Sequence, residues 1–172
     1  MSDIDQVISL LKQRKIGVLP TDTIYGIHCL AGEDSLLSKV YELKGREENI
    51  PLITLISNTK ELEKFGLVIG DFERKVMNQY WPGPNTLIFK NSLGGSKSFR
   101  LPKSSFLTSI LIKTGPLIST SANIHGMPSS KNIHQAISYF GEKVDFYVDG
   151  GDLNNPPSSI YKLEQGSVTK IR

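Results

Sequence analysis

Cysteine is nearly absent from this chain, since Cys29 is the only one among 172 residues. A single cysteine excludes an intramolecular disulfide and any zinc site built on several thiolates, and it favours a reducing compartment. Long apolar runs are also missing, because none approaches the ~18 residues that a membrane span needs. The acidic start of the chain lacks the basic and apolar regions of a signal peptide. We therefore expect a cytoplasmic protein with no membrane partner.

Common catalytic signatures are missing as well. The three histidines, His28, His125 and His134, form neither an H-x-x-x-H nor an H-E-x-x-H pattern, which favours ordinary structural roles for them. No G-x-x-x-x-G-K-[ST] phosphate loop and no G-x-S-x-G nucleophile turn occurs. The sequence therefore argues against a P-loop nucleotidase and against an α/β-hydrolase.

Acidic residues are absent from one long stretch. Residues 74–141 contain no Asp or Glu but eight Lys or Arg, whereas the rest of the chain holds twelve basic and seventeen acidic residues. Such asymmetry favours an anionic partner, either a nucleotide or a nucleic acid. The alternative is a solvated basic face with no ligand, and the asymmetry does not separate a bound nucleotide from RNA.

What the chain does contain is the alternating pattern of an α/β protein. Apolar residues at helical spacing alternate with short apolar runs, and several late strands follow one another without a helix between them. Helices are predicted over 3–15, 34–43, 59–65, 71–80, 104–113 and 131–140. Strands are predicted over 16–19, 26–30, 51–56, 86–89, 97–101, 117–120, 146–148, 159–162 and 168–171. We expect a single α/β domain over residues 1–172, with a twisted, mixed parallel and antiparallel sheet flanked by helices.

Two polar segments stand out against this pattern. Residues 20–26, Pro-Thr-Asp-Thr-Ile-Tyr-Gly, follow a strand and carry several hydroxyls, which suit a small polar ligand at the end of that strand. In the alternative, Asp22 and the two threonines bond their own backbone in a turn. Lys44 and Arg46 flank Gly45 at the end of a helix, where they suit a phosphate or carboxylate, or else the helix dipole. Gly45 ends the helix and would let the backbone approach a ligand.

A third polar segment, residues 119–123, has the sequence Ser-Thr-Ser-Ala-Asn and follows an apolar strand. Its hydroxyls and amide suit phosphate oxygens or a base edge. A helix N-cap or a Ser/Thr turn is the alternative.

Read in order, these segments resemble the YrdC-like family, the threonylcarbamoyl-AMP synthases. The K-x-R signature of that family matches Lys44 and Arg46, and its S-x-N signature matches Ser121 and Asn123. Further matches are Pro-Thr-Asp-Thr-Ile-Tyr-Gly at 20–26, Pro-Leu-Ile at 51–53, Trp-Pro-Gly-Pro-Asn-Thr at 81–86, Arg-Leu-Pro at 100–102, Pro-Ser-Ser-Ile at 157–160 and Ile-Arg at 171–172. The match spans about residues 16–172, and the shared order of the segments gives it its strength.

The resemblance implies a concave, basic cavity and a nucleotidyltransferase activity. The family condenses L-threonine, bicarbonate and ATP, with Mg²⁺, into threonylcarbamoyl-AMP and pyrophosphate. Other proteins of tRNA modification then accept the threonylcarbamoyl group and place it on an adenosine beside the anticodon, so these proteins and tRNA itself are the expected partners. The resemblance also implies that the extra C-terminal domain of the long family form is missing.

The resemblance assigns roles to particular residues. It implies that Lys44 and Arg46 are catalytic and that ATP is bound by Lys44, Arg46, Ser96, Ser121, Asn123, Ser129 and Arg172. It implies that threonine is bound by Thr21, Tyr25, Arg100, Ser119 and Ser158. It implies no side chain as a direct metal ligand, because Mg²⁺ would arrive with ATP.

Four positions depart from the family pattern: Ile50, Asn85, Ser159 and Tyr161. They leave room for a divergent, non-catalytic RNA-binding paralogue of the YciO branch that uses the same cavity. A third interpretation is carbamoyl transfer as in hydrogenase-maturation proteins, which the missing zinc-binding cysteines disfavour.

Overall fold

The computed structural model describes residues 3–48, 50–67, 69–91 and 94–172. The helices are α1 (Ile4–Lys12), α2 (Asp34–Lys44), α3 (Asp71–Tyr80), α4 (Ser105–Thr114) and α5 (Ile133–Phe140), with 3₁₀ turns η1 (Thr59–Phe65) and η2 (Gly141–Lys143). The strands are β1 (Gly17–Pro20), β2 (Tyr25–Leu30), β3 (Ile53–Leu55), β4 (Asn85–Lys90), β5 (Ser96–Arg100), β6 (Leu117–Ser121), β7 (Phe146–Tyr147), β8 (Ser159–Glu164) and β9 (Ser167–Lys170).

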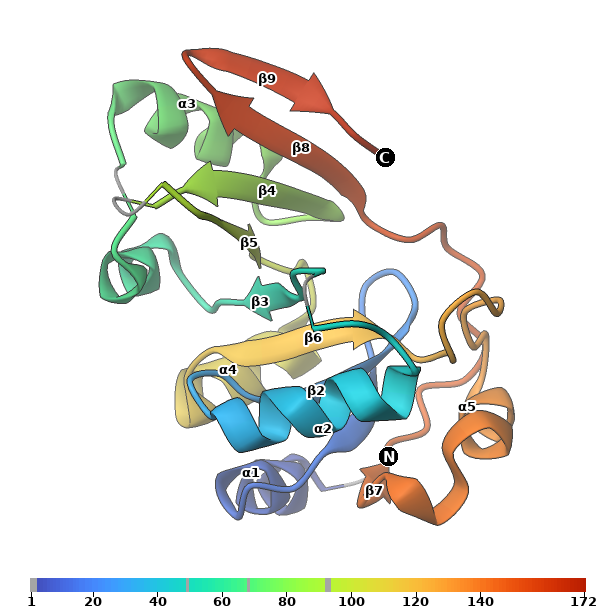
Figure 1. Ribbon diagram of the computed structural model, residues 1–172. Helices are drawn as coiled ribbons and strands as arrows, with labels where there is room; N and C mark the ends of the chain where they lie inside the picture. Colours follow the sequence, from blue (N-terminus) through green and yellow to red (C-terminus); the bar gives the residue numbers. More distant parts are fainter. Residues whose placement is uncertain (1–2, 49, 68, 92–93) are drawn as a thin grey trace.

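The described strands form one nine-stranded sheet in the order β7-β1-β2-β6-β3-β5-β4-β8-β9. Three neighbouring pairs are parallel, namely β1 with β7, β3 with β5 and β4 with β8, and the other five are antiparallel. The prediction of a mixed sheet is therefore confirmed. Strand β6 lies between β2 and β3, so it brings segments that are distant in sequence side by side (Figure 1).

Two apolar clusters cover opposite faces of one half of the sheet. Neighbouring residues of a strand point to opposite faces, and Val18 packs with α2 and α5 whereas Leu19 packs with α1 and α4. Figure 1 accordingly shows α2 and α4 on opposite sides of β2 and β6. A third cluster, around Trp81, Phe89 and Phe99, packs α3 and η1 against β4, β5 and β8. Burial of these apolar side chains is the main source of stability of the fold.

The end of α2 delivers the cationic segment to the sheet. Gly45 adopts a left-handed conformation with φ of 58°, which a glycine adopts without strain, and it ends the helix as predicted. Arg46 therefore leaves the helix axis. Within the described ranges, no helix combines the length and the apolar character needed to cross a bilayer.

Candidate active site

A cavity of about 360 Å³ opens between the two halves of the sheet. It is lined mainly by hydroxyl groups and apolar side chains from the β1–β2 turn, the stretch that leads into β3, strands β4 to β6, and the final residues of the chain. Among the described lining residues none is Asp or Glu, and the cations are Arg46, Arg100 and Arg172. The cavity therefore suits an anionic ligand.

The cations of the acid-free stretch contribute less to this cavity than the sequence indicates. Of the eight Lys and Arg in residues 74–141, Arg100 alone is among the described residues that line it. The stretch instead supplies hydroxyls, through Thr86, Ser96 and Ser98 among others. Lys90 pairs with Glu164 at 2.5 Å, so an acidic residue outside the stretch also offsets its charge.

The β1–β2 turn closes on the hydroxyl of Thr21. This Oγ1 donates to the carbonyl of Ile24 at 2.7 Å and accepts from the backbone N–H groups of Thr23 and Ile24. Hydrogen bonds from a threonine hydroxyl to the backbone of its own turn are the alternative interpretation of this segment. Thr21 nonetheless lines the cavity, so the turn presents a rigid edge to it.

Tyr25 is a wall residue whose hydroxyl is already engaged. Its Oη donates to the carbonyl of Gly151 at 2.8 Å, accepts from the N–H of Gly150 at 2.8 Å and lies 3.4 Å from Asp149 Oδ1. Burial raises the pKa of this phenol. Tyr25 thus ties β2 to the segment that leads towards Ser158, and its predicted contact with threonine would use the remaining surface of the ring.

Lys44, Ser121 and Asn123 meet as the K-x-R and S-x-N resemblance implies. The Lys44 ammonium donates to the Ser121 carbonyl at 2.7 Å, to the Ser121 hydroxyl at 3.2 Å and to Asn123 Oδ1 at 2.7 Å. Burial, followed by the charge of Arg46, lowers the pKa of Lys44 to about 8. The Asn123 amide in turn donates to the carbonyls of Ile124 and Met127, so one lysine fixes the whole loop after β6.

Arg46 differs from Lys44 because it lines the cavity and its guanidinium is not fully hydrogen-bonded among the described residues. Its Nε is buried and has no hydrogen-bond partner among the described residues. Nε itself is closed to solvent, so a ligand in the cavity would meet the other part of the Arg46 side chain, which lines the cavity and whose guanidinium suits an anion. Arg46 is therefore the strongest candidate for direct contact with an anion.

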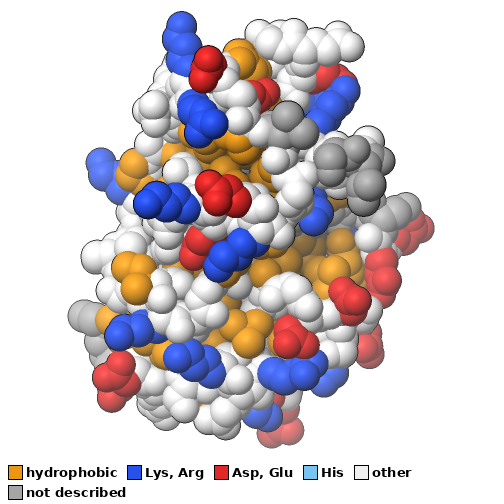
Figure 2. Space-filling model, turned by 90° about the vertical axis from the view of Figure 1, so that its left-hand side faces the viewer, with side chains coloured by type: hydrophobic (Ala, Val, Ile, Leu, Met, Phe, Trp, Pro, Cys, Tyr) orange, Lys and Arg blue, Asp and Glu red, His pale blue; other side chains and the backbone are white. Residues whose placement is uncertain are grey.

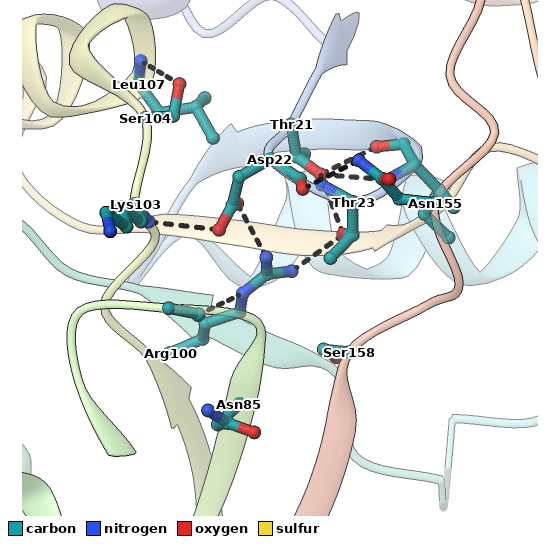
Figure 3. A network of polar contacts seen from close by, with 12 residues as sticks. Thr21, Asp22, Thr23, Asn85, Arg100, Lys103, Ser104, Leu107, Asn155 and Ser158 are labelled. Carbon is teal, nitrogen blue, oxygen red and sulfur yellow. Dashed lines mark hydrogen bonds and ion pairs between the residues drawn. The ribbon is translucent and has the colours of Figure 1, made fainter. Parts of the chain in front are cut away.

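Arg100 is buried and its guanidinium is shared among three partners (Figure 3). Nη2 lies 2.6 Å from Asp22 Oδ1, Nη1 donates to Thr23 Oγ1 at 3.0 Å and Nε donates to the Gly83 carbonyl at 3.2 Å. Asp22 neutralises this cation, so Arg46 and Arg172 carry the unpaired positive charge of the cavity. Arg100 still lines the cavity, where the resemblance places the threonine carboxylate.

Ser158 and Arg172 form the wall at the end of the chain. The Arg172 guanidinium donates twice to the Ser158 carbonyl, at 3.1 and 2.9 Å. The Ser158 hydroxyl lies 3.0 Å from Thr86 Oγ1 on β4. These contacts join Arg172 through Ser158 to strand β4 and leave Arg172 at the cavity surface.

Three further predicted residues, Ser96, Ser119 and Ser129, also line the cavity. Sequence reasoning missed Thr86 and Ser98, although Ser98 shares its strand face with Ser96 and the period of two could have revealed it. It favoured an ordinary structural role for His28, whose ring lies 3.1 Å from the Ser119 hydroxyl. All the predicted residues except Lys44 and Asn123 thus line the cavity, and those two brace its edge through Ser121.

The chain is similar to known proteins over nearly its whole length. A family model for Sua5, YciO and YrdC proteins, described as "Telomere recombination", matches residues 9–172. A Methanocaldococcus jannaschii protein, provisionally named threonylcarbamoyl-AMP synthase, is 33% identical over 97% of this chain and 85% of its own length. The threonylcarbamoyl-AMP synthase of Pyrococcus abyssi is 28% identical over 83% of this chain, which matches 45% of that longer protein.

Solved structures show the same fold. The Sua5 protein of P. abyssi in complex with L-threonine superposes with a TM-score of 0.88 at 25% identity, over 98% of this chain and 53% of that one. The E. coli YciO structure has a TM-score of 0.87 at 18% identity, over 98% of this chain and 87% of that one, which supports the fold alone. Because the family model matches nearly the whole sequence, this chain belongs to the Sua5/YciO/YrdC family.

Proposed function

We propose that this chain is an L-threonylcarbamoyladenylate synthase, a nucleotidyltransferase of tRNA modification. The observation that carries the proposal is the meeting of Lys44 with Ser121 and Asn123, 77 and 79 positions away, beside a cavity that Arg46 lines and whose described lining residues include no Asp or Glu. The relatives named above as synthases, and the solved relative that binds L-threonine, support the choice of substrates.

The proposed reaction has two steps. The amine of L-threonine attacks bicarbonate to form N-carboxy-threonine, with loss of water. A carboxylate oxygen of this carbamate then attacks the α-phosphorus of ATP, and the bond from that phosphorus to the pyrophosphate oxygen breaks. Both reactants are anions, so the barrier is largely electrostatic, and fixed cations lower it more effectively than mobile water does.

Each part of the cavity has a role in this proposal. Arg46 and Arg172 offset phosphate charge, while Lys44 holds the loop after β6, whose Ser121 hydroxyl lines the cavity but donates its proton to Asn123 Oδ1 at 2.6 Å. The wall formed by Thr21, Tyr25, Arg100, Ser119 and Ser158 binds threonine, and Ser96 and Ser129 bind the nucleotide. No dedicated nucleophile is needed, because the substrate carboxylate attacks.

Magnesium enters the proposal as an ion carried by the ATP phosphates. The described lining of the cavity includes no carboxylate, which fits an ion held by the phosphates and by water instead of by side chains. No group of three His, Cys, Asp or Glu suited to a metal occurs within the described part of the chain. When bound, the ion would neutralise phosphate charge and help to align the reacting groups.

The test is product formation from ATP, L-threonine, bicarbonate and Mg²⁺, with threonylcarbamoyl-AMP detected by mass spectrometry and pyrophosphate measured in parallel. Product that depends on all three substrates is the expected result. Arg46→Ala should reduce the rate roughly a hundredfold or more, because it removes a preorganised donor. Lys113→Gln, which removes an exposed cation of α4 outside the cavity lining, is the matched control.

Two outcomes would contradict the proposal. Normal turnover by a folded Arg46→Ala variant would remove Arg46 from the site. RNA binding that weakens steeply with salt, without any use of ATP, would instead favour the non-catalytic RNA-binding module.

A further inference from the structure

His28 lies behind the wall of the cavity. It stands in β2, where it pairs with Gly17 of β1 on one side and Ser119 of β6 on the other, and its side chain is 0% exposed. A Cβ at Gly26 would lie 2.7 Å from the Cε1 atom of the ring, so the glycine leaves the space that the imidazole occupies. The sheet thus has room for this ring because the residue two positions earlier has no side chain.

The ring makes one side-chain hydrogen bond and leaves one nitrogen without a partner. Nε2 lies 3.1 Å from the Ser119 hydroxyl, whereas Nδ1 is buried with no partner among the described residues. An unsatisfied buried polar atom costs about 1–3 kcal/mol, and such atoms in native structures call for an explanation. A leucine of similar size would avoid this cost, so the imidazole lowers the stability of the fold at this position.

The unpaired Nδ1 indicates which tautomer is present. If Nε2 accepted the Ser119 proton, Nδ1 would carry a buried N–H that forms no hydrogen bond in this structure, not even with the Gly26 carbonyl that acts on the ring. If Nε2 carries the proton and donates it, only a lone pair on Nδ1 stays unsatisfied, and unsatisfied acceptors are tolerated better than orphaned N–H groups. The geometry therefore favours Nε2–H as a donor to Ser119 Oγ.

The charge state of the ring agrees with this role. Burial lowers the pKa of His28 to about 4, helped by the positive charge of Arg100 and opposed by the Gly26 carbonyl. The imidazole is thus neutral at pH 7 and adds no charge to the wall. Its effect on the cavity passes through the Ser119 hydroxyl.

We propose that His28 is a positioning residue which donates to Ser119 Oγ and so turns the Ser119 O–H into the cavity, as a donor to a carboxylate oxygen of the amino-acid substrate. A hydroxyl that accepts from behind keeps its own proton for the ligand in front. The choice of ligand rests on the proposed function. Asp22 already neutralises Arg100 nearby, which gives a well-directed neutral donor more weight in holding that carboxylate.

Three variants test the positioning role in steady-state kinetics. His28→Gln keeps an N–H close to the Nε2 position, His28→Leu keeps the volume without a donor, and Ser119→Ala removes the hydroxyl. His28→Leu and Ser119→Ala should each raise the KM for L-threonine roughly tenfold, the effect of one hydrogen bond to a charged group, and leave the KM for ATP unchanged. His28→Gln should restore most of the loss, and the His28→Leu/Ser119→Ala double variant should be no worse than Ser119→Ala.

The opposite pattern would overturn the inference. If the separate increases in the KM for L-threonine multiply in the double variant, His28 does not act through Ser119. The same conclusion follows if His28→Leu has the wild-type KM for L-threonine. Failure of a folded His28→Gln variant to recover would exclude the donor role.

A second measurement uses the wild-type protein and needs no turnover. Nitrogen-15 NMR of the imidazole at pH 7 should show a neutral ring protonated at Nε2 and bare at Nδ1. A ring protonated at Nδ1, or at both nitrogens, would overturn the inference. If the wild type makes no adenylate, the proposed function fails, whereas the NMR result still decides whether His28 donates to Ser119.

Discussion

Lys44 and Arg46 are separated by one residue, but their surroundings differ: Lys44 is hydrogen-bonded within the protein and Arg46 lines the cavity. All three donor directions of the Lys44 ammonium are directed at Ser121 and Asn123, whereas the Arg46 Nε has no partner within the described residues. Lys44 therefore stabilises the loop after β6, and Arg46 is left for the ligand. The motif predicts that both cations are near the site, and only the three-dimensional contacts separate their roles.

Lys44 should make stability depend on pH. Its pKa falls from 10.5 to about 8 in the folded state, so between these values the unfolded chain binds more protons and the free energy of unfolding rises with pH. A shift of this size corresponds to at most about 3 kcal/mol. Urea unfolding of the wild type and of Lys44→Met at pH 7, 8, 9 and 10 should show the wild type gaining relative to the variant as pH rises. Parallel pH curves for the two proteins would contradict the shifted pKa.

The sequence predicted which segments share the site but not the hydrogen-bond partners of individual side chains. The segments around Thr21, Lys44 and Ser121 were predicted to share a site, and they do lie together. The partners of Tyr25 and Arg100 were not predictable, because a side chain with several donors selects among groups that the fold brings near it. Asp22, Gly83 and Gly151 are remote in sequence or common in turns, so no local pattern marks them as partners.

At the scale of elements, local periodicity predicted most helices and strands. It did not predict which strands pair across long sequence separations. The prediction for 59–65 was a helix, and the structure has the tighter 3₁₀ turn η1 there. The position of β6 between β2 and β3 depends on pairs such as Cys29 with Ile118, which no local pattern specifies. Contacts of this kind form by tertiary packing, which depends on the whole chain.

The segment 149–158 shows how one strand positions a long irregular connection. It joins β7 to β8 without helix or strand, and it ends in Pro157 and Ser158 at the cavity. Its anchor is the Tyr25 hydroxyl, which bonds Gly150 and Gly151 from β2. The close approach of Gly150 to Pro20, where a Cβ would lie 2.5 Å from the proline Cβ, adds a second contact with the same hairpin.

Tyr25→Phe should loosen this segment, because it removes a single hydroxyl and leaves the Gly150 N–H and the Gly151 carbonyl without that partner. We expect a loss of about 1–3 kcal/mol in the free energy of unfolding and faster amide hydrogen exchange at Gly150 and Gly151. Tyr147→Phe is the matched control, because its hydroxyl bonds a single exposed carbonyl, that of Gly141. Equal effects of the two substitutions would argue against an anchoring role for Tyr25.

At the scale of the whole molecule, charge is more evenly spread than the sequence suggests. Figure 2 shows Lys and Arg side chains interleaved with Asp and Glu over the face that it draws, with hydrophobic surface between them. Residues 74–141 contain no acidic residue, but acidic residues from elsewhere lie beside them in the fold. Asp22 pairs with Arg100, and Glu164 pairs with Lys90. The positive character that matters for a ligand is local to the cavity, where Arg46 and Arg172 have no acidic neighbour in the lining.

The two halves of the sheet are joined by a buried ion pair as well as by strand pairing. Asp22 lies in the β1–β2 turn and Arg100 at the end of β5, with β6 and β3 between their strands in the sheet. Their side chains are 11% and 6% exposed, and Asp22 also accepts from the N–H of Lys103 at 3.0 Å (Figure 3). This pair sets the relative position of the hydroxyl turn and of the strand that carries Ser96 and Ser98.

Breaking this pair from one side should therefore be costly. Asp22→Ala leaves a buried guanidinium without its counter-ion, and we expect a loss of about 3–5 kcal/mol in urea unfolding. Asp22→Ala/Arg100→Met removes both charges and should cost clearly less than the sum of the single substitutions. Glu33→Ala, which breaks the exposed 2.6 Å pair with Arg14, should cost no more than about 1 kcal/mol. Additive losses in the double variant would mean that the two side chains stabilise their halves independently, and that the cavity is held together by the sheet alone.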